Sequence, residues 1–109
     1  MAETIKVLAQ ADLAATTLTD VFTVPAANNA VISTVTLCNR NAVSVAVRLS
    51  VAVAGAADNN KQYLYYDLPI GGNDTFAFTF GVTLDVGDVI RAFASTTGVS
   101  VNVFGVEIS

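Results

Sequence analysis

The sequence predicts an all-β fold: an antiparallel β-sandwich of about eight strands with a jelly-roll-like topology. Apolar and polar residues alternate with a period of two over much of the chain, as strands with one buried face require. Turn signals rich in Gly, Pro, Asn and Asp separate these stretches at short, regular spacing. No stretch shows the periodicity of an amphipathic helix of useful length. Eight antiparallel strands in one small domain favour a jelly roll, which winds them into two sheets.

The longest alternating stretch runs from Ala30 to Val53, and the rest of the chain is arranged around it. Its first half, Ala30 to Cys38, alternates less regularly than its second. The link Asn39 to Ala42 contains two Asn residues, which tolerate turn conformations. We therefore expect two long antiparallel strands joined by a tight connection. The second strand should bury one face, made of Val43, Val45, Val47, Leu49, Val51 and Val53, and expose Ser44, Ala46, Arg48, Ser50 and Ala52.

Two further strands precede this stretch. Thr4 to Gln10 is the first, with Ile5 beginning its alternation. Residues 11–15 then form either a loop or a brief helical turn. Thr16 to Val24 alternates again and ends at Pro25, because proline lacks the N–H that a strand ladder needs.

The second half of the chain begins with its longest polar loop, AGAADNNK, directly after Val53. Four strands are then expected, at Gln62 to Leu68, Thr75 to Phe80, Asp88 to Ser95 and Val99 to Ile108. The second of these places Phe76, Phe78 and Phe80 on one face, which predicts core. The connecting segment 81–87 should turn Leu84 inward, and Thr96-Thr97-Gly98 predicts a hairpin turn.

The composition indicates a single domain, residues 1–109, with more apolar surface than a free monomer with few charges would expose; that surface is either buried within the domain or covered by other copies or another protein. Hydrophobic residues make up 53% of the chain and charged residues only 13%, against about 25% charged in an ordinary domain. Either both faces of each sheet are buried within the monomer, or copies of the chain cover part of its outside. Residues 1–10 form either the first strand or an N-terminal arm that reaches a neighbour.

Several function classes are not expected. Polar residues interrupt every apolar run, so no membrane-spanning helix or signal peptide is predicted. The net charge of −4 and the scattered basic residues argue against nucleic acid. The chain contains no His, which removes the common catalytic triads and most transition-metal sites. We therefore expect no enzyme activity, no cofactor and no metal.

A few residues are candidates for catalysis or metal binding. Asp67, Asp74, Asp85 and Asp88 are expected to hold turns through hydrogen bonds to the backbone, and catalysis by a pair of them is the weaker alternative. Asp58, Asn59 and Asn60 offer oxygen ligands for Ca²⁺, although their spacing matches no EF-hand. Cys38 is expected to be a small buried residue on a strand.

The residues best suited to an interface are aromatic or basic. They are Tyr63, Tyr65, Tyr66, Arg40, Arg48 and Arg91. In a regular strand Tyr63 and Tyr65 share one face and Tyr66 lies opposite. Exposed tyrosines suit a subunit interface or a sugar-binding surface, whereas buried ones would belong to the core. Arg48 and Arg91 should point away from the core, where each is either solvated along its stem or paired with a carboxylate of this chain or a neighbour.

Four segments of the chain resemble small all-β virion proteins of tailed bacteriophages. They are TLTDVFTVPA at Thr17 to Ala26, VISTVTLCNR at Val31 to Arg40, GVTL at Gly81 to Leu84 and FGVEI at Phe104 to Ile108. The resemblance covers nearly the whole chain and carries no catalytic residue. It implies a structural protein that is assembled in the host cytoplasm and located in the virion.

The role that this resemblance implies first is a capsid decoration (cement) protein that forms a homo-oligomer, with a trimer favoured, on the major capsid protein. The alternatives are a tail, baseplate or fibre-attachment component in contact with tail proteins, or a lectin-like module that binds host glycans. Neither nucleic acid nor a membrane is an expected partner.

Overall fold

The computed structural model describes residues 2–79 and 81–109, most of which are in strands. The strands are β1 (Glu3–Asp12), β2 (Thr19–Thr23), β3 (Asn29–Asn39), β4 (Val45–Ala52), β5 (Tyr63–Ile70), β6 (Thr75–Phe78), β7 (Val82–Leu84), β8 (Val89–Ala94) and β9 (Val99–Ile108). Two short 3₁₀ turns, η1 (Val53–Gly55) and η2 (Asn60–Gln62), lie between β4 and β5. Within these residues no helix is long and apolar enough to cross a membrane.

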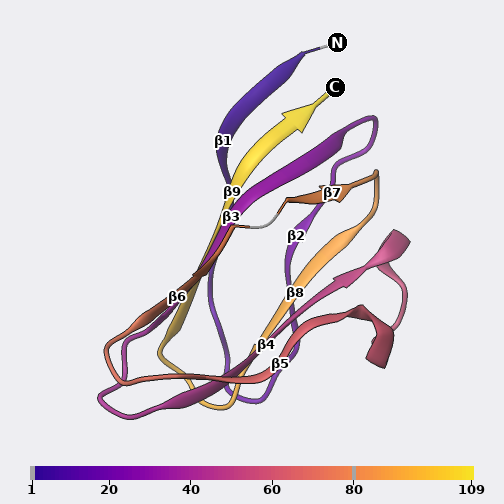
Figure 1. The fold of residues 1–109 in the computed structure, drawn as a ribbon. Helices are drawn as coiled ribbons and strands as arrows, with labels where there is room; N and C mark the ends of the chain where they lie inside the picture. The colour runs from indigo at the N-terminus through magenta and orange to yellow at the C-terminus, as the bar shows by residue number, and fades with distance from the viewer. Residues whose placement is uncertain (1, 80) are drawn as a thin grey trace.

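The strands form two antiparallel sheets that pack face to face around one core (Figure 1). In sheet A the order is β1-β9-β3-β6, and β7 pairs with the other end of β3. In sheet B the order is β2-β8-β4-β5. Strands β6 and β7 therefore act as one interrupted edge strand beside β3. The N- and C-termini lie side by side at one end of the sandwich (Figure 1), where the backbones of Ala2 and Ser109 exchange two hydrogen bonds.

The pairing is nested from the ends of the chain inward. β1 pairs with β9, β2 with β8, β3 with β6 and β7, and β4 with β5. A long hairpin wound into two sheets gives this order, which is the topology of a jelly roll. The predicted all-β sandwich is therefore confirmed, with nine assigned strands if the two halves of the interrupted edge are counted separately.

Two hairpins expected from the sequence are wrong. β3 belongs to sheet A and β4 to sheet B, so the long strands on either side of Asn39–Ala42 do not pair. Likewise Thr96–Gly98 carries the chain from β8 in sheet B to β9 in sheet A. Short polar links look alike whether the chain turns back within one sheet or crosses to the other.

The side chain of Asn39 explains the first of these crossings. It is fully buried, and its amide nitrogen donates to the carbonyl oxygens of Val43 (2.8 Å), Ile70 (3.1 Å) and Gly71 (3.1 Å). Its amide oxygen accepts from the backbone N–H of Asn41 at 2.9 Å. One buried amide thus joins the corner at the end of β3 to the end of β5, and its own donor and acceptor groups are satisfied.

The core is built from the inward faces of both sheets. Val45, Val47 and Leu49 of β4 are buried as predicted, and Val51 packs against the same cluster. Val43 and Val53 were expected on that face but are 69% and 70% exposed, because β4 begins after the former and ends before the latter. The strand is therefore shorter than the alternation suggests.

The opposite side of β4 also departs from the simple inside–outside pattern. Ser50 and Ala52 were expected to be exposed, yet both are fully buried. The segment between β4 and β5 folds over this end of sheet B, where the backbone N–H of Ala54 donates to Asp88 Oδ1 at 2.9 Å. A loop rather than a second sheet covers these two residues.

The remaining elements agree with the sequence in outline. Phe78 is buried and Phe76 packs half-buried against the core, whereas Phe80 lies outside the described residues. Leu84 is buried as predicted, but it lies in strand β7 rather than in a connecting segment. Residues 1–10 were expected as a strand or an arm. Their described part lies mostly in β1, which continues to Asp12.

Candidate interaction surfaces

The outer face of sheet A changes character partway along β9. Val99, Val101 and Val103 point into the core and are fully buried. Phe104 follows directly, and from there the apolar residues occupy the alternate positions, which face outward. The apolar face of this strand therefore passes from the inside to the outside of the sandwich between Val103 and Phe104.

The neighbouring strands extend this outward apolar surface. Val106 lies between Ile5 of β1 and Val31 of β3, and Phe104 lies beside Val7 of β1. Ile5 is 84% exposed and Val7 is 47% exposed. We call the six residues concerned the apolar patch: Ile5, Val7, Val31, Phe104, Val106 and Ile108. None of them is charged, and β1 is an edge strand whose outer side pairs with no other described strand.

The inner side of the same strands carries charge. Lys6 and Glu107 face inward on β1 and β9, and Lys6 Nζ lies 2.6 Å from Glu107 Oε1. The Glu107 side chain is only 10% exposed. A carboxylate at this depth needs a partner, because burying an unpaired charge is costly. At the end of the sandwich that holds the termini, one carboxylate is therefore buried on the inner side while large apolar side chains lie on the outer side.

A glycine and two bulges keep the rows of the apolar patch aligned. β1 and β3 each carry one extra residue beside Phe104, Leu8 in the former and Ser33 in the latter. The Ser33 hydroxyl donates to the Phe104 carbonyl oxygen at 3.1 Å. A Cβ on Gly105 would lie 2.2 Å from the Val31 carbonyl oxygen, so only glycine lets β9 and β3 approach this closely.

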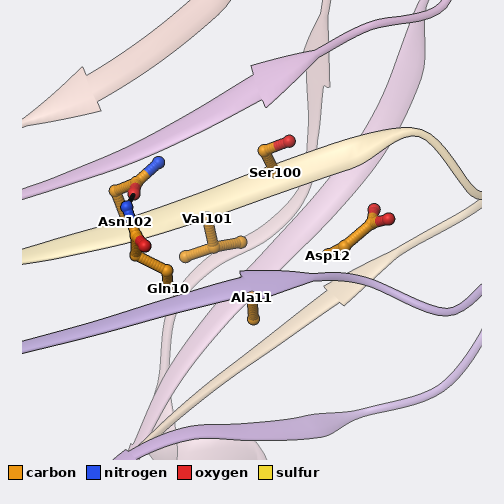
Figure 2. A pocket seen from close by; sticks show the side chains of 6 residues that line it. All are labelled: Gln10, Ala11, Asp12, Ser100, Val101 and Asn102. Carbon is orange, nitrogen blue, oxygen red and sulfur yellow. Dashed lines mark hydrogen bonds between the residues drawn. The ribbon is translucent and has the colours of Figure 1, made fainter.

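The other half of this outer face is polar. The side chains of Gln10 and Asn102 point toward each other across β1 and β9, and the Gln10 amide nitrogen donates to Asn102 Oδ1 at 2.7 Å (Figure 2). Together with Asp12 and Ser100 they line a shallow hollow of about 340 Å³. Cys38 lies on this half-face in the same row as Ser100, half-buried rather than in the core. One sheet face thus joins an apolar half to a hydrogen-bonding half.

The outer face of sheet B is organised around Arg48. Its guanidinium carbon lies 4.1 Å from the ring centroid of Tyr66 and 4.4 Å from that of Phe93. Its Nε also donates to Asp67 Oδ1 at 2.7 Å. The hydrogen bond with Asp67 is the main reason why the pKa of Arg48 is raised above its ordinary value. The charge of Arg48 is therefore satisfied within the chain.

The three tyrosines do not divide between the faces as a regular strand would require. Tyr63 and Tyr66 lie together on the outer face with ring centroids 5.0 Å apart. Tyr65 turns inward and packs edge-on against Phe76 at 5.1 Å and Phe78 at 5.6 Å. The expectation that Tyr63 and Tyr65 share a face is wrong, because β5 pairs irregularly with β4 on both sides of Tyr65.

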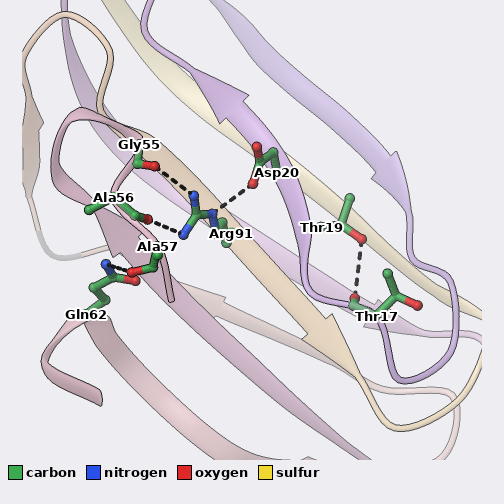
Figure 3. Close-up of polar contacts among 8 residues, drawn as sticks. All are labelled: Thr17, Thr19, Asp20, Gly55, Ala56, Ala57, Gln62 and Arg91. Atoms are coloured by element: carbon green, nitrogen blue, oxygen red, sulfur yellow. Dashed lines mark hydrogen bonds and ion pairs between the residues drawn. The ribbon is translucent and has the colours of Figure 1, made fainter. Parts of the chain in front are cut away.

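Arg91 fastens the loop after β4 onto sheet B (Figure 3). Its Nε donates to Asp20 Oδ1 at 2.8 Å, and its two terminal nitrogens donate to the carbonyl oxygens of Gly55 and Ala56. Its side chain is only 12% exposed. Arg40, in contrast, makes an exposed pair with Asp12 at 2.6 Å. Of the six candidate interface residues, Tyr63, Tyr66 and Arg48 lie together on the outer face of sheet B. The other three, Tyr65, Arg40 and Arg91, contact residues elsewhere in the chain.

The acidic residues mostly hold turns, as expected. Asp88 accepts from the backbone of Ala54 and Asp85, and Asp74 accepts from the N–H of Thr75. Asp67 differs, since its carboxylate pairs with a side chain. In the loop with candidate Ca²⁺ ligands, Asp58 to Asn60, the Asn59 side chain accepts a hydrogen bond from the backbone N–H of Lys61 and thereby closes the η2 turn. No group of three or more His, Cys, Asp or Glu that could hold a metal is found in residues 2–79 and 81–109.

The sequence motifs did not single out the apolar patch. The signal that could have done so is the pair of adjacent apolar residues at Val103 and Phe104, where β9 changes which positions are apolar. Comparison of the chain with protein-family models, curated proteins and solved structures finds no match. The resemblance to phage virion proteins therefore rests on the sequence segments alone.

Proposed function

We propose that the chain is a non-enzymatic structural protein of a bacteriophage virion that acts by burying surface between copies of itself and a larger coat. Its foremost role would be capsid decoration as a homo-oligomer, with a trimer favoured. The observation that carries the proposal is the apolar patch, in which the outward residues of β1, β9 and β3 are apolar while Lys6 and Glu107 point inward.

An isolated monomer gives no reason for this arrangement. Placing Ile5 in water while the Glu107 carboxylate is buried forgoes apolar burial worth about 25 cal/mol per Å². A neighbour that covers the patch would recover that free energy. The free edge of β1 lies beside the patch, and exposed edge strands readily accept another strand. Both features favour a protein contact on this side of the molecule.

The virion assignment is supported by the four resembling segments and by the architecture. Jelly rolls are common in viral capsid proteins, although they also occur in lectins. The scarcity of charge, 13% of residues, suits a protein that other subunits cover. A position in the tail, baseplate or fibre attachment uses the same surface chemistry and differs in how many copies each particle holds.

Copy number in purified virions tests this proposal. Quantitative mass spectrometry against the major coat protein should give a value in the hundreds for a decoration protein. A value between a few and a few tens would place the chain in the tail, neck or baseplate instead. Absence from the particle would contradict the virion assignment altogether.

A further inference from the structure

The outer face of sheet B carries a hollow that the proposed assembly does not use. It has a volume of about 390 Å³ and is lined by Asn60 of η2 and by Tyr63 and Tyr66 of β5. Tyr66 is 58% exposed, although it is a large aromatic residue. The hollow lies on the sheet opposite the apolar patch, so both can be occupied at once.

The ring of Tyr66 is held in place from behind. Arg48 covers one ring face at 4.1 Å from the centroid and is itself supported by Phe93 on its other side. Asp67 fixes the guanidinium through its Nε hydrogen bond of 2.7 Å. The rings of Tyr66 and Tyr63 pack in a T-shaped arrangement with an interplanar angle of 86°. A ring fixed in this way loses little freedom when a ligand packs on it, which favours binding.

The polar groups at the hollow are neutral. The lining residues are an amide and two phenols, and Arg48 is already paired with Asp67. The pKa of Tyr63 is raised, first by burial and second by its hydrogen bond with Asp58, so its hydroxyl stays protonated at neutral pH. No lining group can form an ion pair with a phosphate, sulfate or carboxylate. The Asn60 amide can both donate and accept hydrogen bonds.

We propose that this hollow binds a neutral pyranose unit of a glycan. A pyranose has an apolar face of C–H groups and a rim of hydroxyls. The exposed part of the Tyr66 ring would receive the C–H face. The Asn60 amide would donate to and accept from the rim hydroxyls, and the Tyr63 hydroxyl, whose proton is directed at Asp58, would accept one hydrogen bond. An apolar wall with a few convergent polar groups is the usual construction of a small-molecule site. This function is separate from assembly and does not depend on it.

The test combines a glycan array with saturation-transfer NMR. The array carries neutral, sialylated and sulfated glycans, and the NMR probes are methyl pyranosides of glucose, galactose and mannose, with N-acetylneuraminic acid as the anionic probe. The variants are Tyr66→Ala, which removes the ring, and Tyr66→Phe, which keeps it. Val43→Ala is the control, because Val43 is a similarly exposed apolar residue outside the hollow. Thermal unfolding of each variant checks that the fold is intact.

We expect the wild type to bind at least one neutral probe, and Tyr66→Ala to weaken that binding roughly tenfold, as the loss of an aromatic contact predicts. Tyr66→Phe and Val43→Ala should bind nearly as the wild type does. The proposal is overturned if no neutral probe binds, if only anionic glycans bind, or if Tyr66→Ala binds as well as the wild type. It is also overturned if another copy of the chain, rather than a sugar, is found to cover Tyr66. Any of these results leaves the copy-number test of the virion role unaffected.

Discussion

The outer faces of the two sheets are built from strands of the same kind, yet they present opposite surfaces. On sheet B, Arg48 pairs with Asp67 and Arg91 pairs with Asp20, so each guanidinium is satisfied within the chain. On sheet A, the half beside the termini presents the apolar patch to solvent. This difference is the reason why we propose that another molecule covers the apolar half of sheet A.

This comparison also explains the composition. The mean hydropathy is +0.60, and part of the apolar surface lies on an outer face rather than in the core. Scattered exposed apolar residues are ordinary on any protein, but a contiguous group on three paired strands indicates an interaction site. The predictions below test this division between the faces, from the largest expected effect to the smallest.

The largest effect is expected from comparing substitutions on the inner and outer faces of β4 in sheet B. Val47→Asp places a carboxylate where the side chain is 1% exposed, which costs several kcal/mol against a total stability of about 5–15 kcal/mol. The protein should fail to fold. Arg48→Ala, one residue further along β4, should fold. Circular dichroism and urea unfolding of both variants measure the contrast, and equal behaviour would show that the faces of β4 are assigned wrongly.

The next effect concerns the support beneath the apolar patch. Gly105→Ala places a methyl group against the Val31 carbonyl oxygen and should destabilise the protein by about 1–3 kcal/mol, the usual range for overpacking. Gly81→Ala is the matched control, because nothing lies within 4 Å of a Cβ built there. Urea midpoints report both. A Gly105→Ala variant as stable as the control would contradict the close approach of β9 and β3.

A smaller effect tests how completely sheet B is satisfied within the chain. Arg91→Ala removes hydrogen bonds to Asp20, Gly55 and Ala56, and we expect a loss of about 1–3 kcal/mol and faster amide hydrogen exchange in residues 54–62. Arg40→Ala, which breaks an exposed pair, should cost less than about 1 kcal/mol. Unchanged exchange in Arg91→Ala would mean that other contacts hold the loop.

The smallest effect is a pH dependence at the Tyr63 site. The folded state raises the pKa of this phenol above its ordinary 10.0, so it favours the neutral form. The resulting stabilisation is complete below pH 10 and is lost as the pH rises through the raised value. Between neutral and strongly alkaline pH, the wild type should therefore lose more stability than Tyr63→Phe. Parallel losses in both proteins would remove the support for a buried, hydrogen-bonded phenol.

The strands and the core could be predicted because side-chain alternation is a local property of the sequence. The residues Val45, Val47, Leu49 and Phe78 lie where their alternation places them. Strand pairing is not local. The link after Asn39 could turn back within one sheet or cross to the other. The crossing goes with hydrogen bonds from the Asn39 side-chain amide to three carbonyl oxygens, two of them about thirty residues away.

The candidate site was harder to predict than the fold. The irregular pairing of β5 placed Tyr63 beside Tyr66 and turned Tyr65 into the core, because a bulge moves every later side chain to the other face. Pairing with carboxylates was one of two alternatives for Arg48 and Arg91, and their partners Asp67 and Asp20 could be named only from the structure.

The most direct test of assembly through sheet A is sedimentation velocity of three proteins. They are the wild type, Ile5→Lys in the apolar patch, and Val43→Lys, which places the same charge on another exposed apolar residue outside the patch. The wild type and Val43→Lys should sediment as the same oligomer, and Ile5→Lys should sediment as a monomer whose circular dichroism spectrum shows that it is folded. A monomeric wild type at every concentration, or an Ile5→Lys protein that assembles normally, would contradict the account.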